Sequence, residues 1–438
     1  MKRIISLLLV FVMAIGLTAT LSGDDSAFAK SKKKNSDAAT VSGKVMKLAK
    51  KTKATTEEMI SGYNSFALKA LKTTLSDEEA GKNVMISPAS LMFALDMCAM
   101  GANGKTYSQM ASLIRKGATK RDLVNFAKYY RESLEKSGMM DIANSIWINE
   151  NNLKENKVKI NEAYLNLLRK HFKAAAASRQ FSDAVKDEIN AWISEKTKGM
   201  IPKTLDSLEQ STIMLIINAM AFEGKWKEEY KDWQIDENGK FTNYEGKEEK
   251  AKMLSSEENL YFETGAEKGF VKYYEGNKYA FMAILPDDKN ISINDYVAGL
   301  SDDAFEKFYK SLEYADVDTV TPAFSFDYSI VMNDMLKKLG MKKAFNKDAN
   351  FFDMLSSDSD TSNIALYVGS VIQKTHIELD EKGTKAAAVT VIDMKCEATA
   401  VEPVKIRKSV ILNRPFAFAI VDTETGTPVF AGVVNTLE

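Results

Sequence analysis

The sequence has little cysteine and little histidine, with two of each among 438 residues. Two cysteines cannot build a disulfide framework, so the hydrophobic core alone must hold a chain of this length. Cys98 ends the apolar run 91–98, which predicts a buried helix in which the thiol behaves as a small hydrophobe. We expect Cys98 and Cys396 both to be free thiols.

A net charge of either sign is also missing, because 59 basic residues face 60 acidic ones. The composition therefore gives no reason to expect a nucleic acid or an anionic membrane as partner. The sequence contains no glycine-rich phosphate loop, no His/Cys cluster with metal spacing and no internal repeat, so we expect no cofactor and no metal.

Histidine-assisted catalysis has only two candidate bases. His171 lies in a basic helical stretch, which predicts a surface or capping role, and His376 alternates within an apolar strand, which favours a structural role. No spacing of serine, lysine or carboxylate residues points to another catalytic site. We predict that the protein is not an enzyme.

The N-terminus carries a secretory pattern. Lys2 and Arg3 precede an apolar stretch over residues 4–17, and Ala27-Phe28-Ala29 follows after polar residues. This predicts a signal peptide over residues 1–29 and a secreted, extracellular protein. The apolar stretch is shorter than the roughly 20 residues that span a bilayer, so we expect no membrane span.

Residues 30–54 are rich in lysine, with Asp37 as their only acid. We predict a flexible lead-in to the folded part of the chain. Binding to a polyanion or to the cell envelope stays open as the alternative for this segment.

Helical patterns come early in the chain and strand patterns come late. Residues 55–75 place apolar side chains at helical spacing, and Ser87-Pro88 is a typical helix start. The short apolar or alternating runs that predict strands are 213–217, 279–285, 371–379, 410–412 and 416–421. This order predicts an α+β protein with large sheets, in a single domain over residues 55–438.

Several segments resemble signature segments of one family, the serpins or serine protease inhibitors. They are NVMISPASL at 83–91 with MGANGKT at 100–106, INAWISEKTKGMI at 189–201, NAMAFEGKW at 218–226, FDY at 326–328 with LGM at 339–341, and RPFAF at 414–418 with GTPVFAG at 426–432. They follow family order from about residue 55 to the end. The chain is thereby identified as a member of this family, of the secreted bacterial type. The resemblance implies a serpin fold of helices plus three β-sheets with an exposed reactive loop.

Residues 381–394 resemble the hinge and first half of a serpin reactive loop, which the resemblance places at about 381–410. In serpins a protease cuts this exposed loop and becomes acylated, and the loop then inserts into the central sheet and carries the protease away. The hinge residues implied here are Glu381, Lys382, Gly383, Thr384, Ala386, Ala387 and Ala388. From Thr384 to Met394 every second residue is uncharged, which suits a strand with one face inside a sheet. Lys385 departs from the acidic residue common in the family, but it belongs to the opposite face.

The resemblance implies the position of the scissile bond less directly. Counting from Glu381 places Glu397 before the bond and Ala398 after it. A shift forward gives Ala398-Thr399, and a shift back exposes Cys396 or Lys395-Cys396, which would suit a trypsin-like protease. Cys396 is alternatively a redox-sensitive or partner-linking thiol, or an incidental one.

By the same resemblance, Ser87, Ser90, Asn218 and Gln373 correspond to a cluster beneath the main sheet that must part during insertion. Trp226 corresponds to the residue where the hinge first enters. Many members have a histidine at the position of Gln373, so we expect no acid-triggered opening through this cluster. The implied function is suicide inhibition of a serine endopeptidase by a monomer, with cysteine proteases open as targets. A non-inhibitory binding or carrier serpin is the alternative.

Overall fold

The computed structural model describes residue 48 and residues 51–150, 158–203, 205–208, 214–356, 366–384 and 407–438. The helices are α2 Thr56–Leu75, α3 Pro88–Met100, α4 Gly104–Ile114, α5 Lys120–Lys136, α7 Glu162–Phe172, α8 Asp183–Lys196, α9 Ile293–Gly299, α10 Ala304–Lys310 and α11 Asn333–Lys338. The strands are β1 Val84–Ile86, β2 Met140–Asn149, β3 Ala175–Arg179, β4 Met214–Phe222, β5 Gly224–Lys225, β6 Ile235–Thr242, β7 Glu248–Glu263, β8 Glu267–Tyr273, β9 Tyr279–Pro286, β10 Glu313–Pro322, β11 Phe324–Val331, β12 Ile372–Leu379, β13 Gly383–Thr384, β14 Arg407–Ile411, β15 Phe416–Asp422 and β16 Thr427–Val434. The prediction of an α+β fold is confirmed.

The two predicted helices in the first hundred residues begin where the capping residues indicate. Thr55 caps α2 through a reciprocal pair of hydrogen bonds with Glu58. Ser87 caps α3 by accepting the N–H of Ser90, and Pro88 occupies the first helical position. Every residue of α3 is buried, including Cys98, which is 2% exposed with a free thiol. Helix α3 therefore lies at the centre of the core.

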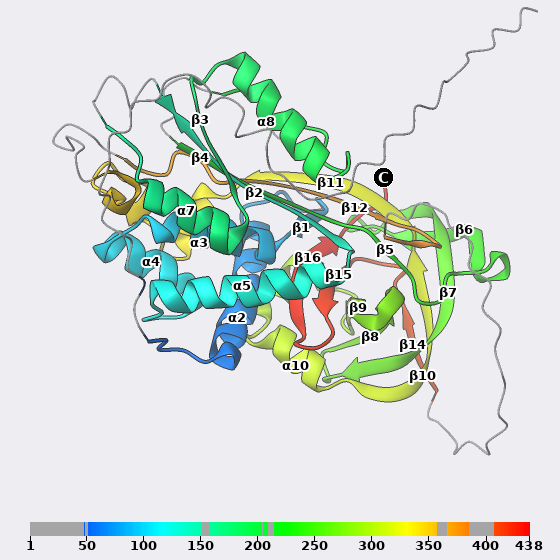
Figure 1. Ribbon diagram of the computed structural model, residues 1–438. Helices are drawn as coiled ribbons and strands as arrows, with labels where there is room; N and C mark the ends of the chain where they lie inside the picture. Colours follow the sequence, from blue (N-terminus) through cyan, green and yellow to red (C-terminus); the bar gives the residue numbers. More distant parts are fainter. Residues whose placement is uncertain are drawn as a thin grey trace, which may run out of the picture. The chain divides into compact units, whose positions relative to one another are not determined.

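The described strands form three sheets. The nine-stranded sheet has the order β1-β16-β15-β9-β8-β7-β10-β14, with β6 paired to β7. The four-stranded sheet has the order β11-β12-β13-β5, and the three-stranded sheet has the order β3-β2-β4. Since β5 follows β4 after a single residue, the two smaller sheets lie side by side, as Figure 1 shows.

The boundary between the two smaller sheets runs between β4 and β12. In the described chain this boundary has one parallel bridge, which joins Ile216 of β4 to Val371, the residue before β12. By contrast, β11 and β12 are paired at eight successive positions, from Phe324–Leu379 to Val331–Ile372. Strand β12 is therefore held firmly on its β11 side and weakly on its β4 side.

Helix α8 lies across the three-stranded sheet, above β2 to β4 in Figure 1. Lys198, just after the helix, pairs with Asp141 of β2 at 2.9 Å. The chain that follows α8 also reaches β12, because the Lys374 ammonium donates to the carbonyl of Lys203 at 2.9 Å. This connection thus links the two smaller sheets on their outer side.

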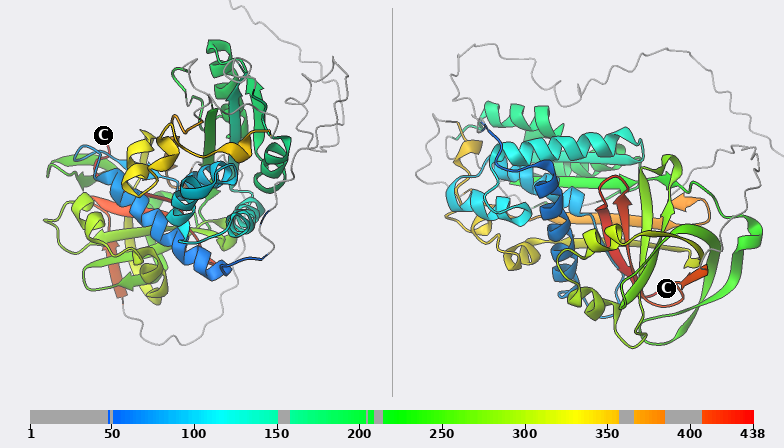
Figure 2. Two further views of the ribbon diagram at one scale, coloured as in Figure 1. Left: turned by 90° about the vertical axis from the view of Figure 1, so that its left-hand side faces the viewer. Right: turned by 90° about the horizontal axis from the view of Figure 1, so that it is seen from below.

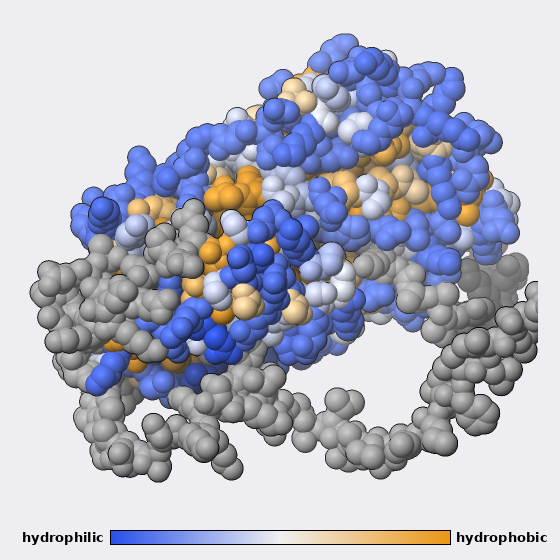
Figure 3. All heavy atoms as spheres, turned by 90° about the horizontal axis from the view of Figure 1, so that it is seen from above, coloured by the Kyte–Doolittle hydropathy of each residue, from blue (hydrophilic) through white to orange (hydrophobic). Residues whose placement is uncertain are grey.

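Helices α2 to α5 and α7 gather at one end of the strands, whereas β6, β7 and β10 lie at the other end (Figures 1 and 2). Seen from above, the surface is mainly hydrophilic, with apolar surface confined to patches between hydrophilic regions (Figure 3). Such a surface is expected when most large apolar side chains are buried in one core.

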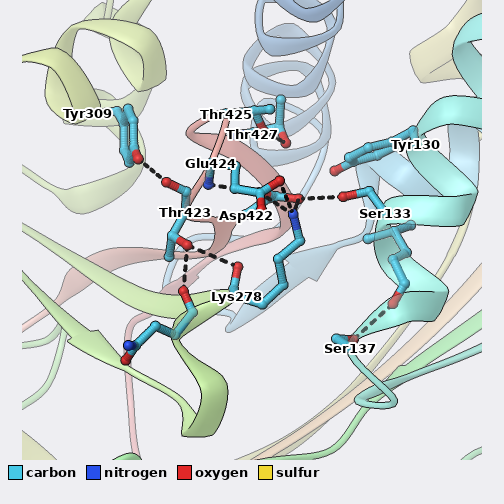
Figure 4. A network of polar contacts seen from close by, with 12 residues as sticks. Tyr130, Ser133, Ser137, Lys278, Tyr309, Asp422, Thr423, Glu424, Thr425 and Thr427 are labelled. Carbon is cyan, nitrogen blue, oxygen red and sulfur yellow. Dashed lines mark hydrogen bonds and ion pairs between the residues drawn. The ribbon is translucent and has the colours of Figure 1, made fainter.

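A buried polar network ties α5 to the turn between β15 and β16 (Figure 4). The Asp422 side chain is 1% exposed, pairs with the Lys278 ammonium at 2.9 Å and accepts the Ser133 hydroxyl at 3.1 Å. Lys278 also pairs with Glu424 at 2.8 Å, and this ion pair lowers the pKa of Glu424. The network fixes the helical end of the molecule to the nine-stranded sheet.

Candidate functional site: the hinge and the sheet boundary

The predicted hinge enters the four-stranded sheet at residues 383–384. Gly383 and Thr384 form β13, which pairs with Leu379 of β12 on one side and with Gly224 and Lys225 of β5 on the other. Thr384 is 3% exposed. A side chain at Gly383 (φ 156°) would bring a Cβ within 2.2 Å of the carbonyl oxygen of Gly224, so this close approach requires glycine. The chain therefore already enters between β12 and β5, inside the four-stranded sheet.

Backbone hydrogen bonds hold the turn before β13. The N–H of Trp226 donates to the carbonyl of Lys382 at 2.9 Å, and the N–H of Tyr230 donates to the carbonyl of Glu381 at 2.9 Å. The indole N–H of Trp226 donates to the carbonyl of Asp380 at 2.9 Å. The structure thus places Trp226, the predicted hinge-entry residue, against the turn 380–382.

An ion pair closes the same turn on its outer side. The Lys252 ammonium lies 2.7 Å from a carboxylate oxygen of Glu381, and the Glu381 side chain is 25% exposed. The hydrogen bond from Lys252 lowers the pKa of Glu381, and the same bond raises the pKa of Lys252. The pair links β7 to the hinge.

The inner side of β13 rests on an aromatic pair. The hydroxyls of Thr384 and Tyr274 are 2.7 Å apart and both side chains are buried. The Tyr274 ring stacks on Trp226 with centroids 4.5 Å apart and planes inclined by 9°. Burial raises the pKa of Tyr274 far above its ordinary value, so its hydroxyl stays protonated and can donate to Thr384.

A buried ion pair supports these aromatic rings. The Lys272 ammonium lies 2.7 Å from Glu258, with side chains 5% and 12% exposed, and it sits 4.4 Å from the Tyr230 ring centroid and 5.5 Å from that of Trp226. Burial alone lowers the pKa of Lys272, but Tyr230 and Glu258 raise it overall. The rings that hold the hinge are therefore packed on a fixed positive charge.

Beneath β12, the structure brings Ser87 and Gln373 together. The N–H of Ser87 donates to the Gln373 amide oxygen, and the Gln373 amide nitrogen donates to the Ser87 carbonyl, both at 2.9 Å. One side chain thus both donates and accepts, as expected for glutamine at this position. The Ser87 hydroxyl donates to the carbonyl of Val429 at 3.0 Å.

The structure places the other two predicted residues of this cluster on α3 and on β4. Ser90 is the residue whose N–H is capped by Ser87, and Asn218 lies in β4 in register with Asn144 of β2. Thr375, two residues beyond Gln373 on the same face of β12, donates its hydroxyl to the carbonyl of Met85 at 2.7 Å. Strand β12 is therefore fastened to the N-cap of α3 through Gln373 and to β1 through Thr375.

Sequence reasoning did not find Lys252, Tyr274, Lys272 or Thr375. Lys272 and Tyr273 end β8 and Tyr274 follows it, and nothing in this local sequence shows which distant residues they will touch. The hinge residues Ala386, Ala387 and Ala388 and the scissile-bond candidates Lys395, Cys396, Glu397, Ala398 and Thr399 lie outside the described residues. The signal peptide over 1–29 lies outside them as well.

The described residues lack two features that would indicate another kind of function. No helix there is both long enough and apolar enough to cross a membrane. Within the same part of the chain, no three His, Cys, Asp or Glu side chains are grouped so that they could hold a metal ion.

Comparison with known proteins shows the family. The family model for serpins (serine protease inhibitors) matches residues 61–437. Human neuroserpin is 27% identical over 395 residues, which cover 86% of this chain and 91% of neuroserpin, and serpin-Z10 of Arabidopsis thaliana is 26% identical over 396 residues, covering 86% and 97%. The chain therefore belongs to the serpin family, whose members are as a class inhibitors of proteases rather than enzymes.

Solved structures agree in fold. The native state of tengpin, a thermophilic serpin, superimposes with a TM-score of 0.78 at 36% identity, covering 88% of this chain and 96% of tengpin. Thyroxine-binding globulin in complex with thyroxine has a TM-score of 0.72 at 22% identity, covering 86% and 99%, which shows the shared fold alone. The predicted serpin fold is thereby confirmed.

Proposed function

We propose that this serpin is an irreversible suicide inhibitor of serine endopeptidases. In this mechanism the protease cuts the loop that follows Thr384 and stays attached as an acyl-enzyme while the loop enters the sheet as a new strand. The observation that carries the proposal is β13, a two-residue strand already paired with β12 and β5. Its direction is antiparallel to both neighbours, as continued insertion requires.

The weak boundary between β4 and β12 supports the proposal. An inserted strand must replace few existing hydrogen bonds, because the described strands share one bridge there. A strand of about 14 residues would gain on the order of 10–20 kcal/mol if each new hydrogen bond contributes roughly 0.5–1.5 kcal/mol. This gain is comparable with the stability of a whole domain. At about 3.3 Å per residue, the attached protease would be carried roughly 46 Å.

The pattern of burial at the hinge also supports insertion. Thr384 is buried, and in the sequence it begins the uncharged alternate set that runs to Met394. Lys385 belongs to the opposite set. If insertion continues from β13 in the same register, the uncharged set faces the core and the charged set faces outwards.

The reaction with proteases tests this function. Purified protein mixed with trypsin-like, chymotrypsin-like and elastase-like enzymes should give a complex with at least one of them that survives boiling in detergent. Thr384→Arg should convert the protein into a substrate that is cleaved without complex formation, because a guanidinium at a buried position opposes insertion. Ser112→Arg, which places the same guanidinium at an exposed position of α4, is the matched control and should still form the complex.

A carrier serpin is the competing function, as the likeness in fold to thyroxine-binding globulin illustrates. A carrier would be cleaved by each protease without forming the stable complex, and cleavage would leave its thermal stability unchanged. That result would exclude inhibition. The same assay with papain-like enzymes decides whether cysteine proteases are additional targets, and the mass of the released fragment locates the cleaved bond among residues 395–399.

We also propose export of the mature protein, with cleavage after Ala29, and a monomeric state. N-terminal sequencing of the protein recovered outside cells tests the first. Light scattering tests the second.

A further inference from the structure

A pocket of about 780 Å³ lies away from the hinge and plays no part in the proposed inhibition. It is lined by the end of α2, by residues 80–81, by the turn between β6 and β7, by residues 289–298, by residues 413–415 and by Asn435. Its volume falls within the range of roughly 300–1,000 Å³ that is usual for small-molecule sites. We call it the asparagine pocket, after the lining residues Asn243, Asn290, Asn294, Asn413 and Asn435.

Part of the pocket wall is rigid. Asn435 is 3% exposed, and its amide donates to the carbonyl of Lys82 at 2.9 Å and to the Asn294 amide oxygen at 3.4 Å. Asn243 donates its amide N–H to Glu249 at 2.6 Å and accepts two backbone N–H groups from its own turn. These amides hold the wall in place before any ligand arrives.

Other polar groups at the pocket have unused bonding capacity. Within the described chain, the side chains of Lys289, Asn290 and Asn413 make no hydrogen bond or ion pair, and all three residues are exposed. Each free amide can donate and accept at once. A ligand that carries groups of both kinds would match them.

Apolar surface faces the same space. Tyr244 is 46% exposed and Ile291 is 38% exposed, which is unusual for large hydrophobic side chains here. The Tyr244 ring lies directly against Gly81, where an added Cβ would come within 2.1 Å of a ring carbon. The glycine therefore allows the Tyr244 ring to pack directly against the backbone. The Tyr244 hydroxyl donates to Glu245 at 3.1 Å.

Most charged side chains that line the pocket already have a hydrogen-bond or ion-pair partner. Lys72 donates to the carbonyl of Leu300, and Arg414 donates to the carbonyl of Pro286. The carboxylate of Glu78 binds the hydroxyl of Tyr328 and pairs with Lys82, and that of Asp295 accepts the hydroxyl of Ser292. Lys289 is the one lining cation without a partner in the described chain. The lining thus offers one unpaired positive charge, while the rest of its free polar groups are neutral amides.

We infer that the asparagine pocket binds a neutral oligosaccharide. Sugar hydroxyls donate and accept hydrogen bonds, as amides do, and the C–H faces of a sugar ring pack on an aromatic side chain. Asn290 and Asn413 would bind hydroxyls from opposite segments of the wall, while Tyr244 and Ile291 cover the apolar face of the ring. This site is independent of the loop and would allow the serpin to be retained on a glycan while the loop meets a protease.

Calorimetric titration of the full-length protein tests the inference. The probes are chitotriose, cellotriose and maltotriose, with sodium phosphate as an anionic probe. We expect at least one trisaccharide to bind. Tyr244→Ala should weaken that binding about two- to twelvefold, because an aromatic contact contributes roughly 0.5–1.5 kcal/mol. Asn413→Ala should weaken it as well.

Tyr314→Ala is the matched control, since Tyr314 is 89% exposed and does not line the pocket. It should leave trisaccharide binding unchanged, and the thermal midpoints of all variants should be equal. The inference is overturned if no trisaccharide gives a heat signal, if phosphate binds instead, or if Tyr244→Ala and Tyr314→Ala affect affinity equally. Complex formation with proteases should be the same in Tyr244→Ala and wild type, which keeps this test separate from that of the inhibitor function.

Discussion

Gln373→Ala should destabilise the intact protein by removing the contact between β12 and the start of α3. The substitution deletes two hydrogen bonds of 2.9 Å to the Ser87 backbone. The Ser87 carbonyl still accepts the N–H of Leu91, but the Ser87 N–H, in a residue 1% exposed, loses the amide that binds it. The bond lost to the Ser87 carbonyl costs about 1 kcal/mol and the buried Ser87 N–H left unpaired costs roughly 1–3 kcal/mol, so we expect a loss of about 2–4 kcal/mol.

Chemical denaturation of the intact protein measures this loss. Glu378→Ala is the matched control, because Glu378 lies on the same strand but is exposed, and it should change the unfolding free energy by less than about 0.5 kcal/mol. Equal midpoints for the two variants would refute the role assigned to Gln373.

Gln373→His extends the test to pH. Burial disfavours a charged imidazole, so the folded-state pKa of this histidine should fall below its unfolded value of about 6.5. Its contribution to stability should therefore be present above about pH 6.5 and be lost as the pH falls through the folded-state pKa. Wild type, with glutamine, should show no such step. A step of equal size in both proteins would mean that another group is responsible.

Three further changes test other parts of the structure. The pKa of Glu381 is lowered in the folded state, so its ion pair with Lys252 stabilises the hinge above about pH 4.5 and is lost as the pH falls below that value. The thermal midpoints of wild type and Glu381→Gln should therefore differ at pH 7 and converge in acid. Lys278→Met leaves the buried Asp422 carboxylate without its cation and should lower the unfolding free energy, measured with denaturant, by about 3–5 kcal/mol. Lys310→Met, at an ammonium that is 72% exposed, should lower it by less than about 1 kcal/mol. Burial raises the pKa of the Cys98 thiol, so a thiol reagent should label Cys98 only after unfolding, and labelling of the folded protein at Cys98 would contradict its placement in the core.

Much of the fold could be predicted from local patterns. The N-caps Thr55 and Ser87 act within three residues of themselves, so the helix starts that they predict do not depend on distant parts of the chain. The strand predicted at 279–285 is β9, Tyr279–Pro286, because a continuous apolar run has to be covered on both faces. The resemblance of ordered motifs to the serpins supplied the topology that such patterns leave undetermined.

The sequence by itself determined that the chain has one large core without disulfides, that α3 is buried, and that the residues from Thr384 onward alternate in a way that suits a strand inside a sheet. Only the tertiary structure decided that Thr384 meets Tyr274, that Lys252 pairs with Glu381, and that β4 and β12 are left almost unpaired. The physical reason is distance along the chain. Helix caps and strand alternation arise between near neighbours, whereas each of these contacts joins residues more than 100 positions apart and exists only once the sheets have packed.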